Sequence, residues 1–129
     1  MDATKYVHDW FERGDEDLKA AEILITENGS PNPVCFHSQQ AGEKYLKGFL
    51  AHQEKHVRKV HDLQLLLEFC IRLDFSFEAL KVNAVFLNKF YVETRYPGDY
   101  PEFTPSEARQ AFEAAKSIKE FVLEKIAAK

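Results

Sequence analysis

Apolar residues in this chain recur every three or four positions, and this helical periodicity is the feature that most constrains its fold. No strand-like alternation of useful length and no convincing internal repeat accompany it. We therefore predict an all-α protein, an up-and-down bundle of four to five helices with short connections. The stripe is clearest over residues 4–27, where it consists of Val7, Trp10, Phe11, Gly14, Leu18, Ala21 and Ile25.

Turn residues and helix caps set the first boundaries. The segment Asn28-Gly29-Ser30-Pro31 ends the first helix, and we expect Gly29 to take the left-handed conformation that closes it. Asn32-Pro33 then opens the second helix, with Asn32 as the N-cap. Gly42 and Gly48 lie inside this helix, where each costs up to ~1 kcal/mol relative to Ala. Close approach of another helix explains them, and simple tolerance is the alternative.

Three further helices follow from the same signals. The first spans about residues 62–73, and the next begins after a short turn, is capped by Ser76 and ends near Thr94 or Arg95. Thr104-Pro105-Ser106-Glu107 is a capping box with Pro at the first helical position, so the last helix begins there.

Length and composition predict one domain over residues 1–129. With 45% hydrophobic and 29% charged residues, the chain is too apolar for disorder and too charged for a membrane protein. Its sequence has no spanning stretch and no leader-like start, so we expect a cytoplasmic protein without membrane contact. Cys35 and Cys70 lie in apolar runs and are expected to be reduced core residues. Gly-rich phosphate loops, GxSxG and HExxH are absent, which argues against several enzyme classes.

Charge is unevenly distributed along the chain. The net charge is −4, yet the window from Lys44 to His61 has five basic residues and one acidic residue, a local +4. Such a patch can hold phosphate on an acidic protein, because screening keeps fields local over about 8–10 Å. A solvated helix end with a basic loop is the competing interpretation. His52, His56 and His61 share the window, but no carboxylate or thiolate completes a zinc set, so we predict no metal and no cofactor.

Polar residues gather at three places that a ligand can use. In the second helix, Gln40, Lys44 and Lys47 share one face by spacing, as do Gln39 and Glu43, and this face should line solvent or an interface. His61-Asp62 precedes the third helix, where it either caps the helix or stands beside an anion-attracting N-terminus. The third place is the segment Arg95-Tyr96-Pro97-Gly98-Asp99-Tyr100. Arg95 either complements the dipole of a helix end or binds a phosphate through two hydrogen bonds while a tyrosine ring stacks on a base.

These segments, taken in order, resemble the HEPN domain (higher eukaryotes and prokaryotes nucleotide-binding). The resemblance covers nearly the whole chain. It rests on Gln39-Gln40-Ala41-Gly42-Glu43-Lys44-Tyr45-Leu46-Lys47-Gly48-Phe49-Leu50, His61-Asp62-Leu63, Thr94-Arg95-Tyr96-Pro97 and an Ala-rich last helix. It implies a dimerising helical bundle similar to the helical domain of kanamycin nucleotidyltransferase, of a stand-alone prokaryotic type often paired with a minimal nucleotidyltransferase. By analogy it implies either binding of a nucleotide or phosphate ligand, or metal-independent RNA cleavage as in toxins of toxin–antitoxin pairs.

The sequence departs from the ribonuclease branch of that family. That branch carries an Arg followed four to six residues later by a His, whereas no histidine follows His61 here, and Tyr100, Pro101 and Glu102 lie downstream of Arg95. Without that imidazole no obvious group remains to move a 2′-hydroxyl proton at neutral pH. We therefore favour a binding module over an enzyme. The candidate ligand-binding residues are Gln40, Glu43, Lys44, Lys47, His61, Arg95, Tyr96 and Asp99, with no catalytic residue assigned.

Three functions follow. The first is a homodimer that binds a nucleotide or RNA and acts as the partner of a minimal nucleotidyltransferase. The second is a ribonuclease toxin that uses Arg95 and an unusual base. The third is a ligand-free oligomerisation domain, for which Phe36, Phe49, Phe86 and Phe90 would supply apolar surface beyond the needs of one small core.

Overall fold

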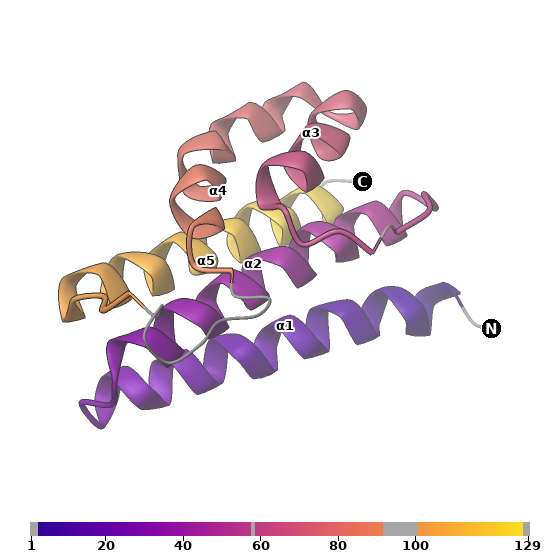
Figure 1. Ribbon diagram of the computed structural model, residues 1–129. Coiled ribbons are helices and arrows are strands. Elements are labelled where there is room, and N and C mark those ends of the chain that lie inside the picture. The colour runs from indigo at the N-terminus through magenta and orange to yellow at the C-terminus, as the bar shows by residue number, and fades with distance from the viewer. Residues whose placement is uncertain (1–2, 58, 92–100, 128–129) are drawn as a thin grey trace.

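The computed structural model describes residues 3–57, 59–91 and 101–127, and this part of the chain is entirely helical apart from its connections (Figure 1). Long helices α1, α2 and α5 lie side by side with α2 in the middle, and the shorter elements pack along one side of α2 and α5. The predicted all-α bundle is confirmed. Its elements are α1 (Ala3–Thr26), α2 (Pro31–His52), α3 (Leu63–Leu73), the 3-10 helix η1 (Phe75–Leu80), α4 (Lys81–Asn88) and α5 (Pro105–Ala127).

Glycines let α1 and α2 approach closely. A Cβ atom on Gly48 would lie 2.7 Å from Cε1 of Phe11, and one on Gly14 would lie 2.7 Å from Cε1 of Tyr45. Both distances are below van der Waals contact, so neither position accepts a side chain unless a ring moves. Close helix approach is therefore the reason for Gly48. The same role for Gly14 was not anticipated from the sequence.

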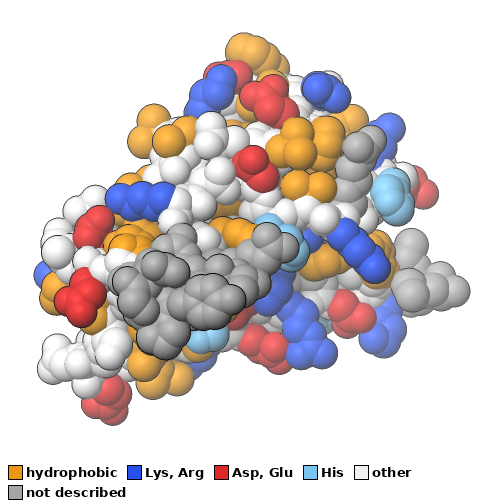
Figure 2. Space-filling model, viewed as in Figure 1, with side chains coloured by type: hydrophobic (Ala, Val, Ile, Leu, Met, Phe, Trp, Pro, Cys, Tyr) orange, Lys and Arg blue, Asp and Glu red, His pale blue; other side chains and the backbone are white. Residues whose placement is uncertain are grey.

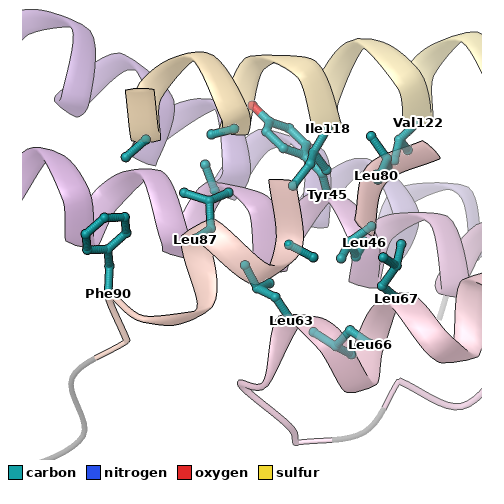
Figure 3. Packing of buried hydrophobic residues seen from close by; sticks show 14 of the residues in the cluster. Tyr45, Leu46, Leu63, Leu66, Leu67, Leu80, Leu87, Phe90, Ile118 and Val122 are labelled. Atoms are coloured by element: carbon teal, nitrogen blue, oxygen red, sulfur yellow. The ribbon is translucent and has the colours of Figure 1, made fainter. Parts of the chain in front are cut away.

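The core lies between α2, α5 and the short helices (Figure 3). α3 contributes Leu63, Leu66 and Leu67, which are at most 1% exposed and lie close to Leu46 of α2. Cys35 and Cys70 are buried free thiols, as predicted, and burial raises the pKa of Cys70 to about 12. Because only the thiolate reacts readily, both cysteines are structural.

Phenylalanine is used more heavily in the core than we predicted. Phe49 and Phe90 are 3% and 1% exposed, and their ring centroids lie 4.4 Å from that of Phe77 and 4.7 Å from that of Phe103, respectively. Only Phe36 and Phe86 of the four rings remain half-buried. Phe49 and Phe90 are therefore not available for oligomerisation, and only Phe36 and Phe86 of the four can contribute apolar surface to it.

The capping box is confirmed. Thr104 N–H donates to Glu107 Oε1 and Glu107 N–H donates to Thr104 Oγ1, both at 3.0 Å. The pKa of Glu107 is held below its usual range, mainly by the hydrogen bond that its carboxylate accepts from Thr104 N–H and next by the nearby Lys89. Asp62 caps α3, because its carboxylate accepts hydrogen bonds from the backbone N–H groups of Gln64 and Leu65.

Two predictions about the α1–α2 turn were wrong. Asn28, and not Gly29, takes the left-handed conformation, with φ of 56°, because Asn tolerates this region nearly as well as Gly. The N-cap of α2 is Ser30, since Pro31 fits the first helical turn. Asn32 instead bridges to the segment before α5: its Nδ2 donates to Pro101 O at 2.7 Å and its Oδ1 accepts from Phe103 N–H at 3.0 Å.

The fourth predicted helix also differs from the structure. Asp74, and not Ser76, provides the cap, with its Oδ1 accepting from Ser76 N–H at 3.0 Å. A 3-10 turn comes first, and α4 then ends at Asn88. The predicted end near residues 94–95 lies outside the described residues. None of the described helices is long and apolar enough to cross a bilayer.

Candidate functional site

A row of polar side chains lies inside the bundle along α2. Gln39, Glu43 and Lys47, spaced four residues apart, are 0%, 3% and 4% exposed. The sequence predicted that this polar face lines solvent or an interface and grouped Lys47 with Gln40 and Lys44. The structure corrects both points, because α2 is the central helix and its neighbours cover this face.

Glu43 is the centre of the row. Its Oε2 lies 2.8 Å from Lys47 Nζ, and both of its carboxylate oxygens lie 3.2 Å from Nδ1 of His61. A carboxylate paired with an ammonium group can only accept hydrogen bonds, so Nδ1 of His61 carries the hydrogen. In the neutral ring this leaves Nε2 as the acceptor. Within the described residues, nothing is hydrogen-bonded to Nε2.

The His61 ring is fixed from two sides. Its plane lies 11° from that of Tyr91, with 4.8 Å between the ring centroids. The backbone oxygen of His61 accepts a hydrogen bond of 3.2 Å from Nε2 of buried Gln39, whose Oε1 accepts from Gln40 at 2.7 Å. The side chain of His61 is nevertheless 47% exposed, whereas that of Glu43 is 4% exposed. A surface imidazole is thus oriented by buried charge, which is the arrangement that positions an imidazole in many acid–base and anion sites.

Lys47 also contacts α1. Its Nζ lies 5.5 Å from the ring centroid of Trp10, within the range of a cation–π interaction. The buried Nε1 of Trp10 has no hydrogen-bond partner among the described residues. Lys47 is therefore held between a carboxylate and an aromatic ring, and its role is to balance the charge of Glu43.

A second polar cluster lies where α1 meets α2. Asp17 accepts from Lys44 through Oδ2 and lies 2.9 Å from Nδ1 of His37 through Oδ1. Nearby, Tyr45 donates a hydrogen bond of 2.6 Å to Asp15. Burial, and then this hydrogen bond, raise the pKa of Tyr45 well above its ordinary value, so the hydroxyl remains protonated. Lys44 is thus paired within the chain.

The basic window of the sequence is divided by the structure. Lys44 and Lys47 face inward to carboxylates, while Lys55, His56 and Lys59 are exposed beyond the end of α2. Of the predicted ligand-binding residues, Glu43, Lys47 and His61 are brought into direct contact and Gln40 joins them through Gln39. Arg95, Tyr96 and Asp99 lie outside the described residues. In the described part of the chain no group of three or more His, Cys, Asp or Glu is placed to hold a metal ion.

Sequence reasoning missed Tyr91 and Trp10. Tyr91 lies inside the helix predicted to end near Thr94 or Arg95, and Trp10 was assigned to the apolar stripe of the first helix. Because Tyr91 lies beyond the end of α4, helical periodicity could not predict that it stacks on His61. One available clue was that Tyr91 lies four residues before Arg95 in a Tyr-rich stretch.

Comparison with known proteins explains this arrangement of helices. The HEPN domain family model matches residues 7–126, almost the full length of the bundle. The chain belongs to the HEPN domain family. Among solved structures, TT1696 from Thermus thermophilus is similar with a TM-score of 0.76 and 32% identity, over 92% of this chain and 97% of that one. ST0689, an archaeal HEPN homologue, gives a TM-score of 0.75 and 28% identity, over 93% and 97% of the two chains.

One curated relative has a name that refers to function. "Putative toxin MJ1304" of Methanocaldococcus jannaschii is 28% identical to this HEPN chain, with 94% of this chain and 91% of that protein covered.

Proposed function

We propose that this HEPN protein binds a nucleotide or short RNA through a phosphate group at the surface formed by His61 and Tyr91. The observation that supports the proposal is the contact of His61 with buried Glu43, which points a fixed imidazole edge outward from a polar interior. In the protonated ring both nitrogens donate, so an exposed Nε2–H beside an aromatic plane suits a phosphate next to a base or sugar.

Arg95 extends this surface in the proposal. It follows Tyr91 by four residues, so its backbone lies within roughly 14 Å of Tyr91 in any conformation of the chain. A guanidinium group is the side chain best suited to forked recognition of phosphate. Tyr96 and Asp99 belong to the same short segment and are proposed to contact the sugar or base.

The proposal assigns Glu43 and Lys47 a supporting role. Both are buried, and their charges cancel, so neither presents charge to a ligand directly. Lys44 is occupied by Asp17, and the N-terminus of α3 by the carboxylate of Asp62. Binding therefore depends on His61 and Arg95 more than on the lysines of α2.

Isothermal titration with ATP, GTP and a single-stranded RNA of about 12 nucleotides tests this proposal. We expect His61→Ala and Arg95→Ala each to weaken binding by roughly 10- to 150-fold, because a hydrogen bond to a charged group contributes about 1.5–3 kcal/mol. His56→Ala, which removes an exposed imidazole elsewhere, is the matched control and should leave affinity unchanged. Absence of binding by the wild-type protein, or equal binding by all variants, would contradict the proposal.

A second candidate function is metal-independent RNA cleavage, favoured by the Nε2 acceptor of His61 and by the toxin name of the relative. In this reaction Nε2 takes the 2′-hydroxyl proton and the 2′-oxygen attacks the adjacent phosphorus. The bond from phosphorus to the 5′-oxygen then breaks, and the departing oxygen takes a proton from water. The products are a 2′,3′-cyclic phosphate and a free 5′-hydroxyl.

This activity is tested by incubating the protein with RNA in EDTA. Cleavage that continues in His56→Ala but is lost in His61→Ala supports His61 as the general base. Unchanged RNA in the wild-type reaction removes this candidate and leaves the binding proposal standing.

Assembly is a further part of the proposal. A homodimer is supported by exposed apolar side chains on α4, where Val82 and Val85 are 79% and 49% exposed. Sedimentation of the wild-type protein and of Val82→Glu tests it, with a shift to the monomer expected in the variant. A minimal nucleotidyltransferase as partner is proposed from the family resemblance alone, and co-purification with the product of a neighbouring gene of that type is its test.

A further inference from the structure

The outer face of α3 carries exposed and half-buried apolar side chains. Leu65 and Leu73 are 41% and 39% exposed, and half-buried Phe69 lies between them at four-residue spacing. The opposite face of α3 supplies Leu63, Leu66, Leu67 and Cys70 to the core. Eight residues at about 1.5 Å each give a stripe of about 12 Å, or roughly two helical turns. Such a stripe matches the anchor spacing of one amphipathic helix.

A cavity of 260 Å³ lies at the C-terminal end of this stripe. Beyond the end of α2, Glu54 adopts φ of 57° and Lys55 N–H donates to Leu50 O at 3.0 Å. This turn brings the chain back against the last turn of α3. The lining consists of Leu50, Lys55, His56, Phe69, Arg72 and Leu73. The volume is below the ~300–1,000 Å³ of small-molecule sites, and it suits a single apolar side chain.

Basic side chains line the cavity, since Lys55, His56 and Arg72 are among its lining residues and no carboxylate is. Lys55 and Arg72 form no ion pair with a described carboxylate, in contrast to Lys44, Lys47 and most other lysines. Asp74 is 3.6 Å from Lys125 and is thereby occupied. Basic side chains that form no ion pair around an apolar cavity are complementary to a partner that is both acidic and apolar.

We propose that the outer face of α3, defined as Leu65, Phe69, Leu73 and the cavity beside them, binds an acidic amphipathic helix of a partner protein. One apolar side chain of that helix fills the cavity and others lie on the stripe, while its carboxylates pair with Lys55 and Arg72. This surface is separate from His61, and the inference does not rest on the proposed nucleotide binding.

The lining favours a peptide over a nucleic acid. The Arg72 guanidinium lies over the Phe69 ring at 5.7 Å from its centroid, so this ring face is already covered. Base stacking requires an open aromatic face, and the other apolar groups here are leucines. Aliphatic anchors flanked by cations are instead typical of a groove that accepts a helix.

Binding to three fluorescein-labelled peptides of about 16 residues tests the inference. The first is a helix with Leu at positions i, i+4 and i+7 and Glu on the flanks. The second has the same composition in scrambled order, and the third has Lys in place of Glu. For the wild-type protein, fluorescence anisotropy should show at least tenfold weaker binding of the second and third peptides.

Charge reversal provides the decisive variant. Lys55→Glu combined with Arg72→Glu changes only exposed side chains, so the far-UV spectrum should be unchanged. The double variant should lose the acidic peptide and gain the basic one. Lys116→Glu, which reverses a cation on α5 away from this surface, is the control and should bind like the wild type.

Four results would overturn the inference. They are no preference for the acidic helix by the wild-type protein, equal binding by the double variant, and loss of RNA binding in place of peptide binding in that variant. The fourth is sedimentation showing a wild-type dimer that the double variant converts to a monomer, which would make a second copy of this chain the occupant.

Discussion

Both long faces of α2 are buried, but by different chemistry. Towards α3, α4 and α5 the contacts are apolar, with Leu46, Leu63 and Leu67 packed together (Figure 3). Towards His61 and Trp10 the buried groups of α2 are charged or polar, namely Gln39, Glu43 and Lys47. The first face can stabilise by burial alone, whereas the second must satisfy each polar atom.

This difference teaches where function resides in the bundle. Charges are costly to bury, so a paired Glu43 and Lys47 inside a small domain need a further reason. Their contact with a half-exposed His61 supplies one: the pair holds an imidazole at the surface. Elsewhere on that surface basic and acidic side chains are interspersed, as the face in Figure 2 shows.

The largest effect is expected from Glu43→Ala. This change leaves the Lys47 ammonium group buried without its carboxylate, so the free energy of unfolding should fall by about 3–5 kcal/mol. Urea denaturation at neutral pH measures it. Glu43→Leu with Lys47→Met should recover most of the loss, because an apolar pair of similar size needs no charge balance. A double variant as unstable as Glu43→Ala would show that the pair is not the origin of the effect.

On the apolar face, Leu67→Ala should cost about 2–5 kcal/mol through lost burial and the cavity left behind. Leu67→Met is the matched control, with an expected cost below about 1.5 kcal/mol because volume is retained. Thermal unfolding of both variants gives the comparison. His61-dependent binding should be unaffected in Leu67→Ala, and parallel losses in stability and binding would mean that the two faces are not independent.

Where α1 meets α2, Gly48→Ala should destabilise the protein, because overpacking costs about 1–3 kcal/mol. The higher helix propensity of Ala offsets up to ~1 kcal/mol of that cost. The added Cβ would lie 2.7 Å from the Phe11 ring. Gly42→Ala is the control, because its Cβ would meet the flexible ends of Ile118 and Leu87 at 3.3 Å and of Leu63 at 3.7 Å. Equal effects of the two substitutions in urea denaturation would argue against close approach as the reason for Gly48.

The smallest effect is expected for Tyr45→Phe, which removes the hydrogen bond to Asp15. Asp15 is 52% exposed and retains Lys119 at 2.9 Å. We therefore expect a loss of about 0.5–1.5 kcal/mol. Differential scanning calorimetry is sensitive enough to resolve it. A loss as large as that of Glu43→Ala would show that the stability cost does not depend on whether the carboxylate, Asp15 or Glu43, is exposed or buried.

Local sequence signals predicted the helices where local physics decides. The capping box at Thr104 and the end of the first helix, predicted near residue 27 and found at Thr26, are examples, because side-chain caps and turn residues act within a few positions. Prediction failed where two neighbouring residues can both take the left-handed conformation, as with Asn28 and Gly29. It also failed where a side chain forms hydrogen bonds with a distant segment, as Asn32 does with the Pro101–Phe103 segment.

The candidate site was only partly accessible from the sequence. Spacing placed Glu43 and Lys47 in one helix, and the position of His61 before the third helix made it a candidate as well. Nothing in the pattern predicted that the lysines of α2 face carboxylates or that Tyr91 stacks on His61. Apart from the pair of Glu43 and Lys47, these contacts join residues far apart in the chain, and periodicity carries no information at that range.

By itself the sequence determined that this chain forms an all-α bundle, because hydrophobic period and caps act locally. The HEPN family was indicated by the resemblance of its ordered motifs. Only the tertiary structure decided which polar residues are buried. That outcome depends on α2 lying between its neighbours, since a side chain is desolvated by the helices packed over it and not by its own position in the chain.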